Sequence, residues 1–338
     1  MGKFSAQDVS HQCLLPSCQT QSCMASYQER SSGVGLLKFP PLKHLICLQQ
    51  WNTQAISDVV ISAMSLKRKL CDSHQQKLDI LRKSKVMILQ EINEPYVNMA
   101  VSKGASLLGA DDVEITDTLD WDQDYQGRIF SDMADIIFVS TTKHGCIRKF
   151  AEKSSVPVLC MYSRAHAPIQ AMATIMSMTQ EFGSLEGLNI AYIGAPHPVL
   201  NSYLVLFPML GANFKFKCCC KICPVSPLMM HVSRDIANTT GTVMQQCSEC
   251  NEALQNASVI ISGPTPSRKE LLPEFTLGLN LINSYTCYRW IYFHTCPRGP
   301  EVDDQLFNHC NARTFDAFKN MQYIAAALMA YLIKEHRF

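Results

Sequence analysis

Short apolar stretches alternate with helical patterns along most of this chain. In the first half, four such stretches are bounded by charged or turn residues, which predicts buried strands at residues 85–91, 112–116, 134–140 and 156–162. The segments between them, including "NEPYVNMAVSKGASLLGA" and "CIRKFAEKSS", have helical spacing. An earlier helix is expected after residue 45, with Thr53 as its N-cap. Strands that alternate with helices imply a parallel sheet.

A second alternating unit follows the long helix "PIQAMATIMSMTQEFGSLEG", which runs into a Gly/Ser hinge at residues 183–187. Its predicted strands are "LNIAYIGA", "NFKFKCCC", "TVMQQC" and "SVIISG", with a helix interrupted by Pro208 and a last helix from about Gln322. The fold class is therefore α/β, with two domains that each hold a parallel sheet flanked by helices and are joined by a long helix. We expect domains at residues 45–182, completed by the C-terminal helix 322–338, and at residues 183–321.

Composition excludes several classes of protein. Hydrophobic residues make up 47% of the chain, which is a globular composition, and the net charge of +1 supplies no general attraction for nucleic acid or for anionic membranes. The apolar run at residues 324–333 is shorter than the ~20 residues that a bilayer span needs. It predicts a buried helix, and neither a nucleic acid nor a membrane is an expected partner.

The first 44 residues are expected to form a poorly ordered leader. They lack the apolar core of a secretory signal and are poor in the arginines of a mitochondrial transit peptide. Sixteen cysteines without a secretory signal favour a reducing compartment. The expected location is intracellular, either cytoplasmic or mitochondrial.

Four motifs arrive in an order and spacing that resemble a known family. They are "ADIIFVSTTKHGCIRKFAEKSSVPVL", "APIQAMATIMSMTQEFGSLEGLNIAYIG", "ASVIISG" and "HTCPRGPEVDDQLF". Together they resemble the aspartate/ornithine carbamoyltransferases, most closely the ornithine branch. The resemblance implies a carbamoyl-phosphate-binding domain followed by an amino-acid-binding domain, transfer of the carbamoyl group to an amine, and a trimer with the site near a subunit boundary. It implies no metal or organic cofactor, because such catalysis consists of positioning and electrostatic stabilisation.

The resemblance also shows where this sequence departs from the family's phosphate site. The family's Ser-Thr-Arg-Thr-Arg motif at a helix N-terminus is Glu94, Pro95, Tyr96, Val97 and Asn98 here, and the next family arginine is Ser140. Each charge-assisted hydrogen bond contributes about 1.5–3 kcal/mol, so the loss of three arginines removes at least ~5 kcal/mol, or more than about 10³-fold in affinity. Carbamoyl phosphate bound in the usual way is therefore excluded.

Other family positions are partly kept. The family's His-Pro-x-Gln is Ala167, Pro168, Ile169 and Gln170, and His166 lies one residue earlier, as a substitute ligand or an exposed loop histidine. On the amino-acid side, the family's two asparagines are His197 and Pro198, its ligand-binding aspartate is Gly263, and Ser267 keeps the serine of the next turn. An arginine expected before the last helix is Asn320.

The loop "HTCPRGPEVDD" is the best-kept part of the resemblance. The ornithine branch has His-Cys-Leu-Pro-Arg, and this chain has His294, Thr295, Cys296, Pro297 and Arg298, so the thiol lies one residue later. The implied catalytic positions are His294, Cys296, Arg298 and Gln170, as vestiges, and the implied substrate-binding positions are Pro168, Ser267, Pro297 and His166.

The cysteines suggest an alternative. Cys220, Cys223, Cys247 and Cys250 form two Cys-x-x-Cys pairs that resemble a zinc or redox site, although buried cysteines also serve as small apolar residues.

Three hypotheses follow. The chain is a degenerate, non-catalytic ornithine carbamoyltransferase homologue, or an active carbamoyltransferase with an altered substrate, or a zinc or redox protein. The first predicts weak binding of carbamoyl phosphate or an amino acid, and a homotrimer or an assembly with an active homologue.

Overall fold

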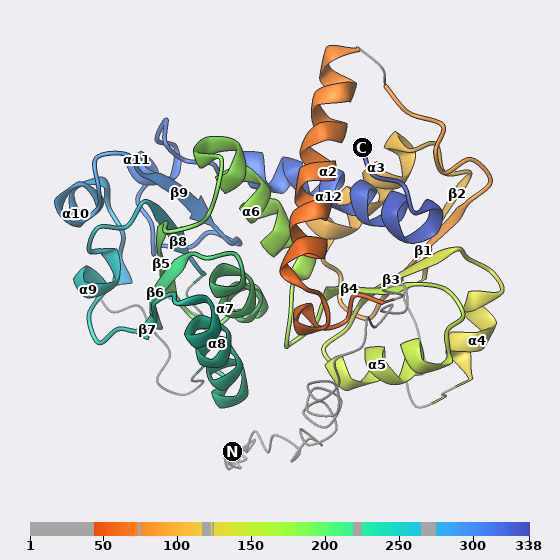
Figure 1. Ribbon diagram of the computed structural model, residues 1–338, viewed down its shortest axis with the longest axis horizontal. Coiled ribbons are helices and arrows are strands. Elements are labelled where there is room, and N and C mark those ends of the chain that lie inside the picture. The colour runs from red at the N-terminus through yellow and green to blue at the C-terminus, as the bar shows by residue number, and fades with distance from the viewer. Residues whose placement is uncertain (1–43, 74–75, 117–122, 124, 219–224, 265–274) are drawn as a thin grey trace, which may run out of the picture. The chain divides into compact units, whose positions relative to one another are not determined.

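Two parallel sheets with helices on both faces make up the described part of the chain. The computed structural model describes residues 44–73, 76–116, 123, 125–218, 225–264 and 275–338 (Figure 1). The first sheet has the strand order β2-β1-β3-β4, and the second has the order β7-β6-β5-β8-β9. Every pairing within both sheets is parallel, as predicted.

The elements of the first sheet and its helices alternate along the chain. They are η1 (Leu48–Gln50), α2 (Thr53–Asp72), β1 (Lys85–Gln90), α3 (Pro95–Leu107), β2 (Asp112–Thr116), α4 (Gln126–Ser131), β3 (Ile136–Ser140), α5 (His144–Lys153), β4 (Val158–Tyr162) and α6 (Pro168–Phe182). All four predicted strands of this half are confirmed. An isolated bridge between Leu45 and Leu159 adds the segment before η1 to the edge of the sheet beside β4.

The second sheet follows α6. Its elements are β5 (Asn189–Gly194), α7 (Pro198–Met209), β6 (Asn213–Cys218), α8 (Pro227–Thr240), β7 (Met244–Gln246), α9 (Cys250–Leu254), β8 (Val259–Ser262), α10 (Leu279–Tyr285), β9 (Ile291–His294), α11 (Asp304–Phe307) and α12 (Thr314–Lys334). Helix α8 and strand β9 are not among the elements that the sequence pattern predicted.

Three predicted boundaries are wrong. The N-cap of α2 is Asn52 and not Thr53, because the Asn52 side chain accepts a hydrogen bond from the backbone N–H of Ala55 at 2.8 Å. Pro208 does not interrupt α7, which includes it and ends one residue later. The last helix begins at Thr314 and not at Gln322, since its first two turns contain polar residues that an apolar pattern misses.

Strand residues alternate between two cores, as the pleat of a strand requires. On β1, Val86 and Ile88 face a core shared with α2, α3, α6 and α12, whereas Met87 and Leu89 face a core shared with α4 and α5. In the second sheet, Tyr192 faces α7 and α8, and Ile193 faces the side of α9 to α11. Both sheets are therefore covered on both faces, which explains why the inner strands β1, β3 and β5 read as apolar runs.

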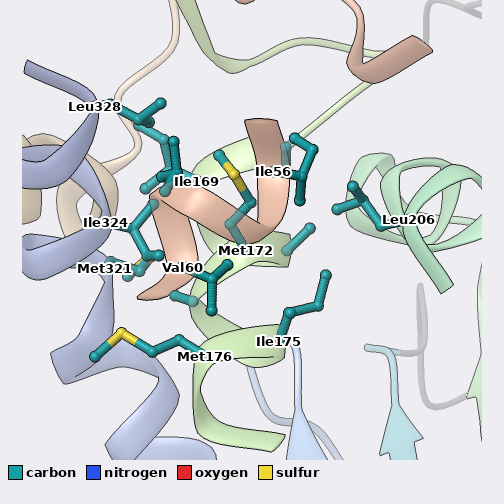
Figure 2. Close-up of a cluster of buried hydrophobic side chains, with 14 of the residues drawn as sticks. Ile56, Val60, Ile169, Met172, Ile175, Met176, Leu206, Met321, Ile324 and Leu328 are labelled. Carbon is teal, nitrogen blue, oxygen red and sulfur yellow. The ribbon is translucent and has the colours of Figure 1, made fainter. Parts of the chain in front are cut away.

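The last helix lies in the core of the first half of the chain. Helix α12 packs against α2, α3 and α6. Figure 2 shows Ile324, Met321 and Leu328 of α12 beside Val60 of α2 and Ile169 of α6. The expected burial of residues 324–333 is confirmed for Ile324 to Ala330, each at most 1% exposed. No helix within the described segments is long and apolar enough to cross a membrane.

The close approach of α3 and α12 depends on Gly104. A Cβ at this position would lie 2.8 Å from the backbone oxygen of Gln322 and 3.0 Å from the backbone nitrogen of Ala326. We therefore expect Gly104→Ala to push the helices apart and to lower the free energy of unfolding in urea by about 1–3 kcal/mol. Gly145→Ala in α5 is the matched control, because nothing lies within 4 Å of its Cβ. That variant should be unchanged or up to ~1 kcal/mol more stable. Equal effects of the two substitutions would contradict the packing argument.

Candidate active site

The carboxyl ends of the central strands define where a ligand site is expected. In the first sheet the chain order reverses between β1 and β3, and in the second it reverses between β5 and β8. Ligands of open parallel sheets bind at such switch points. Many of the positions that the sequence singled out lie at or after the ends of these strands or of the neighbouring strands β4 and β9.

His294 organises the loop after β9. Its Nδ1 accepts the backbone N–H of Cys296 at 2.8 Å, so its proton is on Nε2, which donates to Glu301 Oε1 at 2.8 Å. The same Glu301 oxygen accepts the N–H of Gly299 at 2.7 Å. His294 and Glu301 are both buried. The histidine therefore holds the loop together from inside, and Glu301 is a partner that the sequence reasoning missed although it lies in the same motif.

Cys296 and Pro297 form the bend of this loop. Cys296 has a positive φ of 52°, and the Cys296–Pro297 peptide bond is cis. Burial, with a smaller contribution from Glu301, raises the pKa of the Cys296 thiol to about 11. At neutral pH this thiol is protonated and is a poor nucleophile.

Arg298 is held by its own loop. Its guanidinium donates to the backbone oxygen of Val302 at 3.2 Å and forms an ion pair with Asp304. It also lies 4.6 Å from the centre of the Phe307 ring, within the range of a cation–π interaction. A hollow of about 440 Å³ is lined by Arg298, Gly299, Pro300 and Val302. The guanidinium of Arg298 is thus engaged by Asp304 and Phe307, which the sequence reasoning did not assign to it.

Gln170 meets the loop from the other half of the chain. Its Nε2 donates to the backbone oxygen of Thr295 at 2.8 Å. Pro168 is at the first turn of α6 and is buried, so it sets where this helix starts. The structure therefore brings Gln170 to the 294–298 loop, through a backbone contact. Thr295 Oγ1 is buried without a hydrogen-bond partner beside that contact.

Residues 94–98 begin α3. Glu94 is the N-cap, without a side-chain cap hydrogen bond, and burial raises the pKa of its carboxyl. Asn98 donates to Gln90, and its Oδ1 has no hydrogen-bond partner. Ser140, at the end of β3, is fully buried, and its hydroxyl is also without one. The helix N-terminus and the adjacent strand end therefore carry neutral side chains and one carboxyl group.

His166 is not an exposed loop histidine. It is only 2% exposed, and burial, with a smaller contribution from His144, lowers its pKa to about 3. Its Nδ1 lies 3.5 Å from the hydroxyl of Ser202, and its ring packs edge-on against that of His144. Its ring therefore packs into the interior at the start of α6.

The positions at the ends of β5 and β8 are His197 and Gly263. A Cβ at Gly263 would lie 2.0 Å from the Tyr192 hydroxyl, which donates to the backbone oxygen of Ala195 at 2.7 Å. His197 caps α7, with its Nδ1 accepting from Val199 N–H at 3.2 Å. Burial, with a smaller contribution from His294, lowers the pKa of His197 to about 4. Ser267 lies outside the described residues.

The zinc alternative gains no support. Cys220 and Cys223 lie outside the described residues. Burial, with a smaller contribution from Glu252, raises the pKa of Cys247 to about 11, which disfavours the thiolate that binds zinc. Cys247 and Cys250 pack in the apolar core on one face of the second sheet. Among the described residues, no group of three His, Cys, Asp or Glu side chains could hold a metal ion.

The fold is a two-part α/β architecture with a parallel sheet in each part. The family model of the carbamoyl-P binding domain of aspartate/ornithine carbamoyltransferase matches residues 43–180, and that of the Asp/Orn binding domain matches residues 186–332. The chain therefore belongs to the aspartate/ornithine carbamoyltransferase family.

Curated relatives and solved structures agree with this family assignment. An ornithine carbamoyltransferase of Acinetobacter baumannii is 26% identical over 62% of this chain and 69% of that protein. A mitochondrial ornithine transcarbamylase of Gallus gallus is 22% identical over 87% of this chain and 86% of that protein. The ornithine carbamoyltransferase structure from Pyrococcus furiosus has a TM-score of 0.81 at 18% identity and covers 88% of this chain and 99% of that one. At 18% identity, the likeness to the Pyrococcus furiosus structure establishes the fold alone.

Buried neutral histidines make stability depend on pH. Burial lowers the pKa of His144, His166 and His197 to about 4, 3 and 4, whereas unfolded histidine titrates near 6.5. Below about pH 6.5 the unfolded state binds more protons, so the free energy of unfolding should fall as pH falls from 6.5 towards 4. The free energy of unfolding in urea is measured at pH 6 and pH 5. In His166→Gln it should change less steeply with pH, by about 1 kcal/mol per pH unit. The unsubstituted chain, measured at the same two pH values, is the reference. An unchanged slope in His166→Gln would contradict a neutral buried imidazole.

Proposed function

We propose that this chain is an ornithine carbamoyltransferase-like protein whose catalytic activity is lost or strongly impaired. The observation that carries the proposal is the N-terminus of α3, where Glu94 is the cap and residues 94–98 include no cation. The family resemblance implies that a phosphate dianion is held at this place by arginines. A carboxylate at a helix N-terminus occupies the position that such an anion needs and repels it.

The cations that lie on segments near the expected site do not support a replacement. Lys103, Arg128 and Lys143, which lie on segments near the expected site, are all exposed, as expected of solvated surface charges. Arg298, the one arginine kept from the family loop, already neutralises Asp304. These facts weigh against the alternative of an active carbamoyltransferase with an altered substrate, which would need new positive charge in the pocket.

The acceptor side supports the same proposal. An α-amino group needs a carboxylate partner, and the family's aspartate is Gly263 here. Since the Tyr192 hydroxyl occupies the space that a side chain at 263 would need, a single Gly263→Asp change would not restore the partner. Ornithine should therefore bind weakly, as should carbamoyl phosphate. The proposed vestigial site comprises His294, Cys296, Arg298 and Gln170, with Pro168, Pro297, His166 and Ser267 around it.

The remaining features are proposed from the family. Residues 45–182 form the carbamoyl-phosphate-type domain together with the C-terminal helix, which begins at Thr314 and not at 322, and the residues from 183 up to this helix form the amino-acid-type domain. The packing of α12 against α2, α3 and α6 supports this assignment. The assembly is a homotrimer or a mixed assembly with an active homologue. The location is intracellular, cytoplasmic or mitochondrial, and the mitochondrial ornithine transcarbamylase of Gallus gallus among the relatives supports the second.

The proposal predicts that the purified chain forms no citrulline from carbamoyl phosphate and ornithine. It also predicts no thermal shift with a phosphonate analogue of carbamoyl phosphate at concentrations that saturate an active family member, because at least ~5 kcal/mol of anion binding is missing. Calorimetric titration with the same analogue measures the affinity directly. Citrulline formation at the rate of an active relative would overturn the proposal.

A restoration variant makes the test specific. Replacing residues 94–98 by Ser-Thr-Arg-Thr-Arg, together with Ser140→Arg, should strengthen binding of the phosphonate by at least about tenfold if the lost charges are the cause. The matched control carries the same changes with glutamine in place of each arginine. If both variants bind equally, charge is not the reason for the loss.

A further inference from the structure

A second cluster of reactive side chains lies at the edge of the first sheet, beside β4. Cys47 precedes η1, and its Sγ lies 3.2 Å from Nε2 of His144, the first residue of α5. The two residues are 97 positions apart in the sequence, and the Leu45–Leu159 bridge brings the segment of Cys47 to β4. Both side chains are partly exposed. The other ring nitrogen of His144 contacts the hydroxyl of Ser163, which follows β4, at 2.9 Å.

The surroundings of Ser163 decide which nitrogen of His144 carries the proton. The Ser163 hydroxyl oxygen accepts the backbone N–H groups of Ala165 at 3.2 Å and His166 at 3.1 Å. These two bonds occupy both of its lone pairs, so the hydroxyl donates its proton. Of its two acceptors, His144 Nδ1 at 2.9 Å is nearer than the backbone oxygen of His166 at 3.4 Å. With Nδ1 as acceptor, the proton of the neutral ring is on Nε2 and points at the sulfur of Cys47. The chain thus has a thiol, an imidazole donor and a hydroxyl that orients the imidazole.

The electrostatic setting favours a negative sulfur. A hydrogen bond from an N–H group stabilises the charged form of an acid. Burial, with a smaller contribution from Arg148 one turn further along α5, lowers the pKa of His144 to about 4. His144 is therefore neutral near pH 7 and keeps its proton on Nε2. The positive end of the α5 helix dipole, at His144, also stabilises a thiolate.

We propose that Cys47 is a reactive thiol that forms mixed disulfides with low-molecular-weight disulfides. The Cys47 thiolate attacks one sulfur of the disulfide, a new S–S bond forms to Cys47, and the original S–S bond breaks. The other half leaves as a thiolate and takes a proton from water, while the proton of Cys47 has gone to solvent, so atoms and electrons balance. His144 acts as the positioning residue, and Ser163 orients it. This proposal does not rest on the proposed function, since Cys47 lies outside the carbamoyltransferase loops described above.

The place of Cys47 gives such a modification a structural consequence. Its side chain packs against the core that Met87 and Leu89 of β1 share with α4 and α5. An adduct on Cys47 should therefore loosen the packing of the segment before η1 on this core.

The test measures thiol reactivity in the full chain. The protein is incubated with glutathione disulfide at pH 7, and each cysteine peptide is quantified over time by mass spectrometry. Cys71 on α2 is the internal reference, because it is exposed while Cys47 is only partly exposed. We expect Cys47 to react about tenfold faster than Cys71 in spite of its lower exposure, since a stabilised thiolate is more abundant. Cys47 reacting no faster than Cys71 would overturn the proposal without the need for any variant.

Two variants separate reactivity from a purely structural role. His144→Gln should lower the rate at Cys47 about tenfold, to the level of Cys71, while the rate at Cys71 stays unchanged. His231→Gln, on the exposed face of α8, is the matched control and should leave both rates unchanged. An undiminished rate at Cys47 in a folded His144→Gln protein would show that the imidazole does not activate the thiol.

Discussion

The burial of α12 is the interaction on which the rest of the structure depends. This helix packs against α2, α3 and α6, and its residues Ile324 to Ala330 are almost completely buried. Its first residue also reaches the second sheet, since the hydroxyl of Thr314 accepts the backbone N–H of His294 at 2.9 Å. The last helix therefore completes the core of the first half of the chain and fixes the end of β9, from which the 294–304 loop starts.

The 294–304 loop is held in shape largely by its own residues. His294, Glu301 and Gly299 satisfy one another's hydrogen bonds, Arg298 is neutralised by Asp304, and Gln170 holds the backbone at Thr295. A buried polar group without a partner costs about 1–3 kcal/mol, so these bonds stabilise the shape of the loop, in which Thr295 Oγ1 alone of the groups discussed is unpaired. Retention of these residues is accounted for by folding alone. The losses at Glu94, Ser140 and Gly263 concern groups that would act on a ligand.

Most of the strand pattern could be predicted from the sequence because strands covered on both faces are short, apolar and bounded by charge. The interior of β1 is an example, with Val86 to Leu89 buried towards two different cores. Helix α8 was missed although Pro227 at its first turn and Gly241 in the left-handed conformation after its end are ordinary helix signals. The start of α12 was placed too late because Thr314 is buried through its hydrogen bond to β9, a contact between residues 20 positions apart. The protonation state of His166 was likewise inaccessible, because desolvation depends on everything that surrounds the ring.

The sequence by itself determined the family, the alternating α/β architecture and the absence of arginine from residues 94–98. These properties follow from residue identity and local periodicity, which need no coordinates. Only the tertiary structure decided where the retained groups are directed: Arg298 to Asp304, Gln170 to Thr295, and His144 to Cys47. Their partners come from other strands, helices or turns, and hydrogen bonds depend on distances of a few ångströms that sequence spacing does not specify.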